Sequence, residues 1–172
     1  MKRFFPAAAL VLLTVGQAGQ ASAVDVTAAI GQSGESNMTY RLGLQFDFDR
    51  SWFETGVGRL TGYWDAGYTY WQGDRDSANH SLSFAPVFVY QFAGEGVRPF
   101  IEAGIGVALF ERTSLEGNNL STAFQFEDRF GVGLRFSGGH QLGLRAIHYS
   151  NAGIKRPNEG TESYSLFYRV AL

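Results

Sequence analysis

The strongest constraint on the fold is an alternation of apolar and polar side chains with a period of two residues. In residues 38–48 large apolar side chains occupy every second position from Met38 to Phe48, with small or polar residues between most of them. The same division recurs in residues 59–70, 81–92, 101–109 and 124–136. Successive side chains of a strand point to opposite faces, so this period predicts β-strands with one bulky apolar face. The pattern therefore predicts an all-β fold.

Three further segments complete a closed set of strands. Shorter strands are expected near residues 24–30, 141–150 and 161–172, which brings the predicted number to eight. Eight antiparallel strands can close into a barrel whose interior is filled by side chains, and an even number returns both ends of the chain to one side.

Alternation alone does not say which face of a barrel points outward. A soluble eight-stranded barrel such as a lipocalin would keep the apolar face inside, whereas an outer-membrane barrel turns it toward lipid. The opposite face carries small residues such as Ser83, Gly104 and Gly131, which suit a crowded lumen, and Tyr, Trp and Phe gather near the strand ends, as in an interfacial girdle. These features favour an eight-stranded antiparallel transmembrane β-barrel over the soluble alternative.

A transmembrane barrel of this kind assigns a side to each connection. We expect the connections at 49–58, 93–98 and 137–140 on the periplasmic side, and those at 32–37, 72–79, 112–120 and 151–160 on the external side.

The first 23 residues have the features of a secretory signal peptide. Lys2 and Arg3 precede an apolar run, and the segment ends in the small-residue pattern Ala21-Ser22-Ala23. We therefore expect cleavage after residue 23, a single mature domain over 24–172 and a location in the cell outer membrane. No later run approaches the roughly 20 apolar residues of a membrane-spanning helix. The chain has no cysteine, which excludes disulfides, and its net charge of −2 does not suggest a nucleic-acid partner.

Three polar side chains interrupt the apolar face of the last two strands. His148 and Ser150 share the face of Leu144, and Glu162 lies on the corresponding face of the following strand. A hairpin centred on residue 155 puts Glu162 opposite His148 with Cβ atoms roughly 5 Å apart, and Ser150 roughly 6.6 Å along the strand from His148. A serine, a histidine that takes its proton and a carboxylate that orients the histidine are what nucleophilic acyl transfer requires. The alternative is that all three are polar rim residues in the headgroup region, where such side chains cost little.

The residues around these positions resemble a known enzyme family. Residues 146–153, Ala-Ile-His-Tyr-Ser-Asn-Ala-Gly, and 162–168, Glu-Ser-Tyr-Ser-Leu-Phe-Tyr, closely resemble the lipid A 3-O-deacylase (PagL-type) family of outer-membrane enzymes, and residues 58–68 and 99–106 are similar to it as well. The resemblance implies an eight-stranded barrel that hydrolyses the ester-linked acyl chain at the 3-position of lipid A in lipopolysaccharide.

The resemblance also implies roles for individual residues. By its motif His148 is the base, Ser150 the nucleophile and Glu162 the carboxylate of a Ser-His-Glu triad, and Asn151 and Gly153 form the oxyanion hole. Donors beside the nucleophile, in a loop whose glycine lets the backbone approach, suit that task. The implied partners are lipopolysaccharide as substrate and the outer membrane, without cofactor, metal or nucleic acid. A second copy of the chain, in a homodimer, is also compatible with the sequence.

Two other functions remain as alternatives. One is an outer-membrane phospholipase, which would prefer glycerophospholipids and typically needs calcium at a dimer interface. The other is a structural or adhesive barrel without catalysis. Mass spectrometry of lipid A before and after exposure to the purified protein would separate the deacylase from both alternatives.

Overall fold

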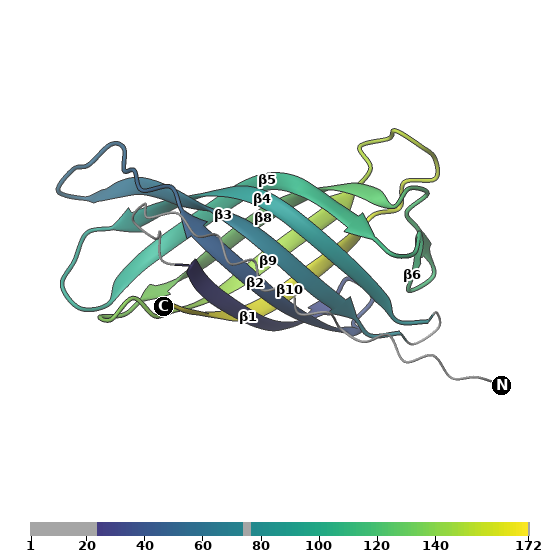
Figure 1. Ribbon diagram of the computed structural model, residues 1–172, viewed down its shortest axis with the longest axis horizontal. Helices are drawn as coiled ribbons and strands as arrows, with labels where there is room; N and C mark the ends of the chain where they lie inside the picture. The colour runs from purple at the N-terminus through teal and green to yellow at the C-terminus, as the bar shows by residue number, and fades with distance from the viewer. Residues whose placement is uncertain (1–23, 74–76, 172) are drawn as a thin grey trace, which may run out of the picture.

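The alternating segments form eight long antiparallel strands in the computed structural model, which describes residues 24–73 and 77–171 (Figure 1). Each strand pairs with the next one along the chain, and the last pairs with the first, so the sheet closes on itself. The strands are β1 (Val24–Ser33), β2 (Met38–Asp47), β3 (Gly58–Trp71), β4 (Asn79–Phe92), β5 (Arg98–Phe110), β8 (Phe124–Arg135), β9 (Gln141–Ser150) and β10 (Thr161–Val170). The predicted eight-stranded antiparallel barrel is confirmed. The expected leader at residues 1–23 lies outside the described residues.

Two details differ from the sequence-based expectation. The opening strand continues to Ser33 instead of ending near Ile30, because its pairing with β10 extends to Ser163. The connection expected at 112–120 is not a plain loop, since it holds the short hairpin of β6 (Ser114–Leu115) and β7 (Asn118–Asn119). Strands of two residues are too short to show any periodicity.

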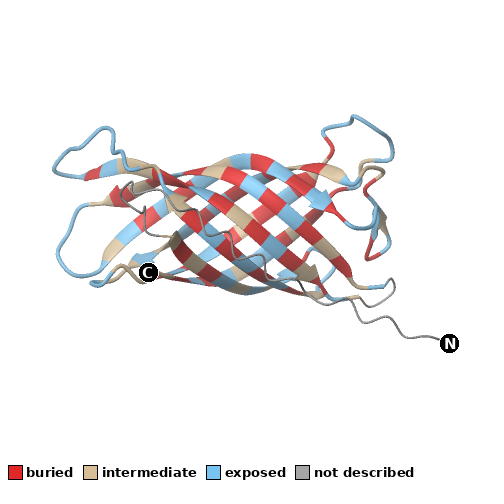
Figure 2. Ribbon diagram, viewed as in Figure 1, coloured by how far each residue is buried: buried red, intermediate tan, exposed pale blue. Residues whose placement is uncertain are grey.

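The apolar face of the sheet points outward and the polar face lines the lumen. Buried and exposed positions alternate along each strand and produce the chequered pattern of Figure 2. Leu42, Ile105 and Leu144 are 60%, 68% and 61% exposed, whereas Arg41, Asp65 and Glu102 are 6%, 0% and 1% exposed. The soluble alternative with an apolar interior is therefore wrong, and the barrel has the faces of a transmembrane one. Over the described residues no helix is long and apolar enough to cross a membrane.

A network of charged side chains fills the middle of the lumen. Asp65 accepts hydrogen bonds from Arg129 Nη2 at 3.0 Å and from Arg41, and Arg129 Nε donates to Glu127 Oε1 at 3.0 Å. Gly67 makes room for this packing, since a Cβ atom there would lie 2.0 Å from an Arg41 nitrogen. Opposite charges thus compensate one another where bulk water is excluded.

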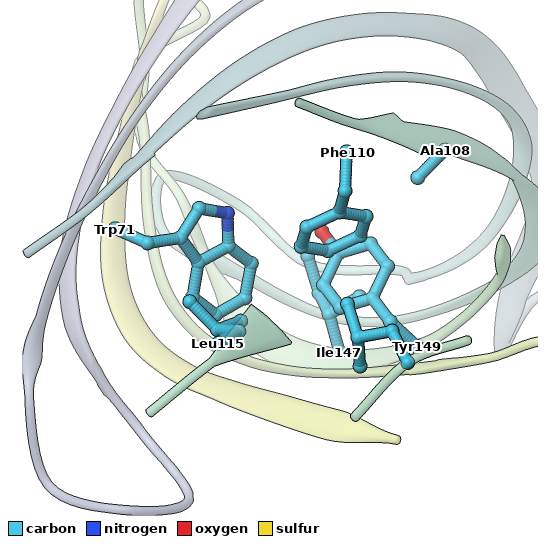
Figure 3. Packing of buried hydrophobic residues seen from close by; sticks show 7 residues of the cluster. Trp71, Ala108, Phe110, Leu115, Ile147 and Tyr149 are labelled. Atoms are coloured by element: carbon cyan, nitrogen blue, oxygen red, sulfur yellow. The ribbon is translucent and has the colours of Figure 1, made fainter. Parts of the chain in front are cut away.

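Two apolar clusters also lie in the lumen, where the sequence pattern predicted mainly small and polar residues. One contains Trp71, Ala108, Phe110, Leu115, Leu120, Ile147 and Tyr149 (Figure 3), and the rings of Trp71, Phe110 and Tyr149 pack against one another. The other contains Tyr63, Ala85, Val87, Val89, Phe100 and Phe167. Because the rings fill the space between the strands, the barrel interior is a packed core.

Candidate active site

The three polar residues predicted from the last hairpin lie together on the outward face, where β9 ends and β10 begins. The register of this strand pair places Glu162 directly opposite His148, as predicted. Ser150 is the last residue of β9 and has the same strand parity as His148. Alternation therefore puts all three side chains on the lipid-facing side of the barrel.

A hydrogen bond joins the histidine to the carboxylate. His148 Nδ1 lies 2.9 Å from Glu162 Oε1, and the two side chains are 45% and 39% exposed. With Nδ1 occupied in this way, Nε2 is the ring nitrogen left to interact with a hydroxyl group. Ser150, the third residue of the predicted triad, is not hydrogen-bonded to His148, since its hydroxyl forms no hydrogen bond with any of the described residues. Such contacts often tighten only when substrate is bound.

The β1–β2 connection packs against the carboxylate from the other side. Gly34 N donates to the backbone oxygen of Glu162 at 3.2 Å. A Cβ atom at residue 34 would lie 2.8 Å from Glu162 Oε2, so only glycine leaves the carboxylate its present space. Glu162 is thus held between His148 and this connection, which limits its rotamers.

A fourth polar residue, Asp128, joins the site, and sequence reasoning did not assign it a role. Asp128 on β8 pairs with His148 on the side opposite Glu162, and its position on the strand faces outward. His148 therefore has a carboxylate residue opposite it on each neighbouring strand. The signal was present in the sequence, because Asp128 is the one break in the apolar face of its segment.

The two residues predicted for the oxyanion hole differ in their surroundings. Asn151 is fully buried, and its side-chain Nδ2 donates to Leu120 O and to Lys155 O, both at 2.9 Å. Its backbone N–H donates to Asn158 Oδ1 at 2.9 Å. Gly153 is exposed in the turn that follows, with φ at +79°, a conformation that favours glycine. Its N–H has no acceptor among the described residues, so Gly153 is the freer donor of the two.

An apolar groove on the outer wall leads to the histidine and the carboxylates. Its volume is about 770 Å³, and it crosses the strands from β4 to β10. Phe88, Ile105 and Phe130 supply bulky apolar walls, while Ala103 and Ala146 are small residues of the same outward parity. Asp128, His148 and Glu162 also line it. The groove opens toward the lipid-facing side and could hold a long apolar chain beside the polar residues.

The described residues contain no group of three or more His, Asp or Glu side chains arranged to hold a metal ion. The chemistry that the site can perform with its own residues is proton transfer by His148 and nucleophilic attack by Ser150.

Comparisons with known proteins point to one family. A family model described as lipid A 3-O-deacylase (PagL) matches residues 38–171. The chain is similar to the lipid A deacylase PagL of Pseudomonas aeruginosa, with 58% identity and full coverage of both chains. It is also similar to the lipid A deacylase PagL of Bordetella bronchiseptica, with 35% identity over 74% of each chain. Among solved structures, the crystal structure of the outer membrane enzyme PagL has 62% identity and a TM-score of 0.83, covering 86% of this chain and 99% of the other.

Proposed function

The chain belongs to the lipid A 3-O-deacylase family, and we propose that it is a serine esterase that removes the acyl chain ester-linked at the 3-position of lipid A in lipopolysaccharide. The fold and the relatives identify it as an outer-membrane β-barrel enzyme. The observation that supports the proposed mechanism is the hydrogen bond between His148 and Glu162, which lies beside an apolar groove. His148 is two residues from Ser150 on β9.

In the proposed reaction the Ser150 hydroxyl attacks the carbonyl carbon of the ester. His148 Nε2 accepts the hydroxyl proton, and Glu162 holds the ring through Nδ1 and stabilises its cation. Collapse of the tetrahedral intermediate breaks the bond to the sugar oxygen, which takes the proton from His148. A water molecule, deprotonated by His148, then attacks the acyl-serine; His148 returns the proton to the Ser150 oxygen as the ester bond breaks and a fatty acid is released.

The oxyanion of the intermediate needs donors that are not already engaged. The Gly153 N–H meets this condition, and we propose it as the main donor. The N–H groups of Asn151 are engaged with carbonyl and amide oxygens, so we propose that Asn151 contributes by holding the turn in shape.

The substrate is proposed to reach the site sideways from the outer leaflet. The acyl chain would lie in the apolar groove, with its ester beside His148 and Glu162. Access through the lumen is disfavoured, because charged and aromatic side chains fill it. A lipid-embedded ester therefore meets the triad without leaving the membrane interface.

Lateral access predicts the environment of spin labels at two positions of β9. A nitroxide at Ser150→Cys should be relaxed more by lipid-soluble oxygen than by a water-soluble nickel complex, because residue 150 shares the outward face. A nitroxide at Arg145→Cys is the matched comparison, since Arg145 is 3% exposed and faces the lumen. A lumen-like response at 150 would contradict lateral access even if the three residues proved catalytic.

Calcium separates the deacylase from the phospholipase alternative. The purified protein should release fatty acid from lipid A at the same rate with and without chelator, because no carboxylate cluster among the described residues is arranged for a hard cation. It should leave a diacyl glycerophospholipid intact. Loss of activity in chelator, restored by calcium and directed at the glycerophospholipid, would favour the phospholipase. Hydrolysis of neither lipid would favour a non-catalytic barrel.

A further inference from the structure

The connection between β5 and β8 enters the external mouth of the barrel. We call residues 111–123 of this connection the plug; it includes the β6–β7 hairpin (Figure 1). Its residues Leu115 and Leu120 are 2% and 0% exposed. Both belong to the lumenal cluster with Trp71 and Tyr149, and Figure 3 shows Leu115 beside the Trp71 ring. The plug is therefore anchored by apolar packing inside the barrel.

Side-chain hydrogen bonds attach the plug to several strands. Asn79 at the start of β4 donates through Nδ2 to Arg112 O at 2.9 Å and accepts from Arg112 N at 3.1 Å. At the hairpin turn, Ser33 Oγ donates to Glu116 Oε1 at 2.6 Å. The barrel thus determines where the plug lies, both through its apolar side chains and through these bonds.

The plug is in turn bonded to the β9–β10 connection, which carries Gly153. The backbone oxygen of Leu120 accepts from Asn151 Nδ2 at 2.9 Å, and Ser121 Oγ donates to Pro157 O at 2.5 Å. Asn151 Nδ2 also donates to Lys155 O at 2.9 Å, across the turn that contains Gly153. A continuous set of contacts therefore leads from Leu115 and Leu120 in the lumen to that turn.

We propose that the plug is a positioning element for the oxyanion hole, and that Leu115 and Leu120 are positioning residues that set its depth in the barrel. The inference rests on the proposed function. If the plug shifts, the Leu120 carbonyl moves Asn151 and with it the Gly153 N–H, relative to Ser150. The His148–Glu162 pair stays in place, because the β9–β10 ladder holds it. Chemistry is sensitive to such shifts, since a misplacement of about 1 Å can cost about 100-fold in rate.

The test compares Leu115→Ala and Leu120→Ala with the wild-type full-length protein in lipid A-containing detergent micelles. We expect kcat to fall about 10- to 100-fold with KM changed less than about twofold, because truncation lets the plug relax without altering the groove. Covalent labelling of Ser150 by a fluorophosphonate should slow by a similar factor, since it uses the same oxyanion donors. The rate of His148 modification by diethyl pyrocarbonate should stay unchanged. Leu115→Met, which keeps the volume, should restore most of the activity.

Two further variants make the test specific. Val87→Ala truncates a buried residue of the other lumenal cluster and should leave kcat and both modification rates unchanged. Ser121→Ala removes the hydroxyl bond to Pro157 O, together with a longer one to Asn119 Oδ1 inside the plug, and keeps the apolar packing of the plug. This variant therefore tests the inference even if the leucine variants do not fold; kcat should fall about threefold, the loss of one modest hydrogen bond to the β9–β10 connection.

Three outcomes would overturn the inference. The first is a wild-type kcat and a wild-type rate of Ser150 labelling in both leucine variants when they fold. The second is a wild-type kcat in Ser121→Ala when the leucine variants do not fold. The third is a loss of kcat in Val87→Ala equal to that of the leucine variants, together with an altered rate of His148 modification. Ser150→Ala separates this failure from failure of the proposed function. If Ser150→Ala keeps its activity, the serine mechanism fails; if it is inactive while the plug variants match wild type, only the positioning role fails.

Discussion

Replacing Ser150 with alanine or His148 with asparagine is expected to lower the turnover of lipid A by on the order of 10⁴-fold or more. Each change removes a group that the proposed reaction cannot replace, the attacking oxygen or the base. Glu162→Ala should leave about 10- to 100-fold more activity than either, because a carboxylate that orients the histidine is less essential than the groups that react. The measurement is kcat for release of fatty acid from lipid A.

The matched control for this series is Ser165→Ala. Ser165 is also a serine of the final hairpin, but its parity on β10 is opposite to that of Glu162, so it points toward the lumen. All variants should keep the heat-dependent mobility shift of a folded barrel in gel electrophoresis. Wild-type turnover in Ser150→Ala, or an equal loss in Ser165→Ala, would reject the assignment of the nucleophile.

The second large effect is expected in stability. Arg129→Ala should lower the free energy of unfolding by about 3–5 kcal/mol, because it leaves Asp65 and Glu127 buried with less compensating charge. Both carboxylate side chains are 0% exposed, so water cannot readily replace the lost guanidinium. Urea titration of the barrel in lipid vesicles, followed by tryptophan fluorescence, measures the difference.

An exposed ion pair provides the comparison for the buried one. Arg59 Nη1, at the start of β3, lies 3.9 Å from Glu54 Oε1 in the β2–β3 connection, and the two side chains are 46% and 63% exposed. Arg59→Ala should change the free energy of unfolding by less than about 1 kcal/mol, since solvent screens such pairs. Equal destabilisation by the two substitutions would mean that the lumenal network contributes no more than a surface contact.

The fold could be predicted because the membrane imposes a simple rule on each strand. Lipid-facing positions must be apolar, so an alternation of apolar and polar residues is visible in every long strand. Against that alternation His148, Ser150 and Glu162 stand out as polar exceptions. The pairing of Glu162 with His148 followed from the centre of the last hairpin, which sets the register of both strands.

The features that escaped prediction depend on long-range packing. Nothing in the local pattern of residues 111–123 indicates that Leu115 and Leu120 enter the lumen, because that burial is created by side chains of other strands such as Trp71 and Tyr149. Asp128 was visible only as a break in alternation, and its place opposite His148 required the register between β8 and β9. The engagement of Asn151 with the Leu120 carbonyl likewise joins residues 31 positions apart.

Mass spectrometry of lipid A is the direct test of the proposed esterase activity of Ser150. Lipid A is incubated with the wild-type protein and, in parallel, with the Ser150→Ala variant, and the products are fragmented to locate the remaining acyl chains. The wild-type protein is expected to remove one acyl chain, from the 3-position, with a free hydroxyl left on the sugar, and Ser150→Ala is expected to leave lipid A unchanged. Loss of a chain from another position, or the same product from both proteins, would contradict the proposed activity.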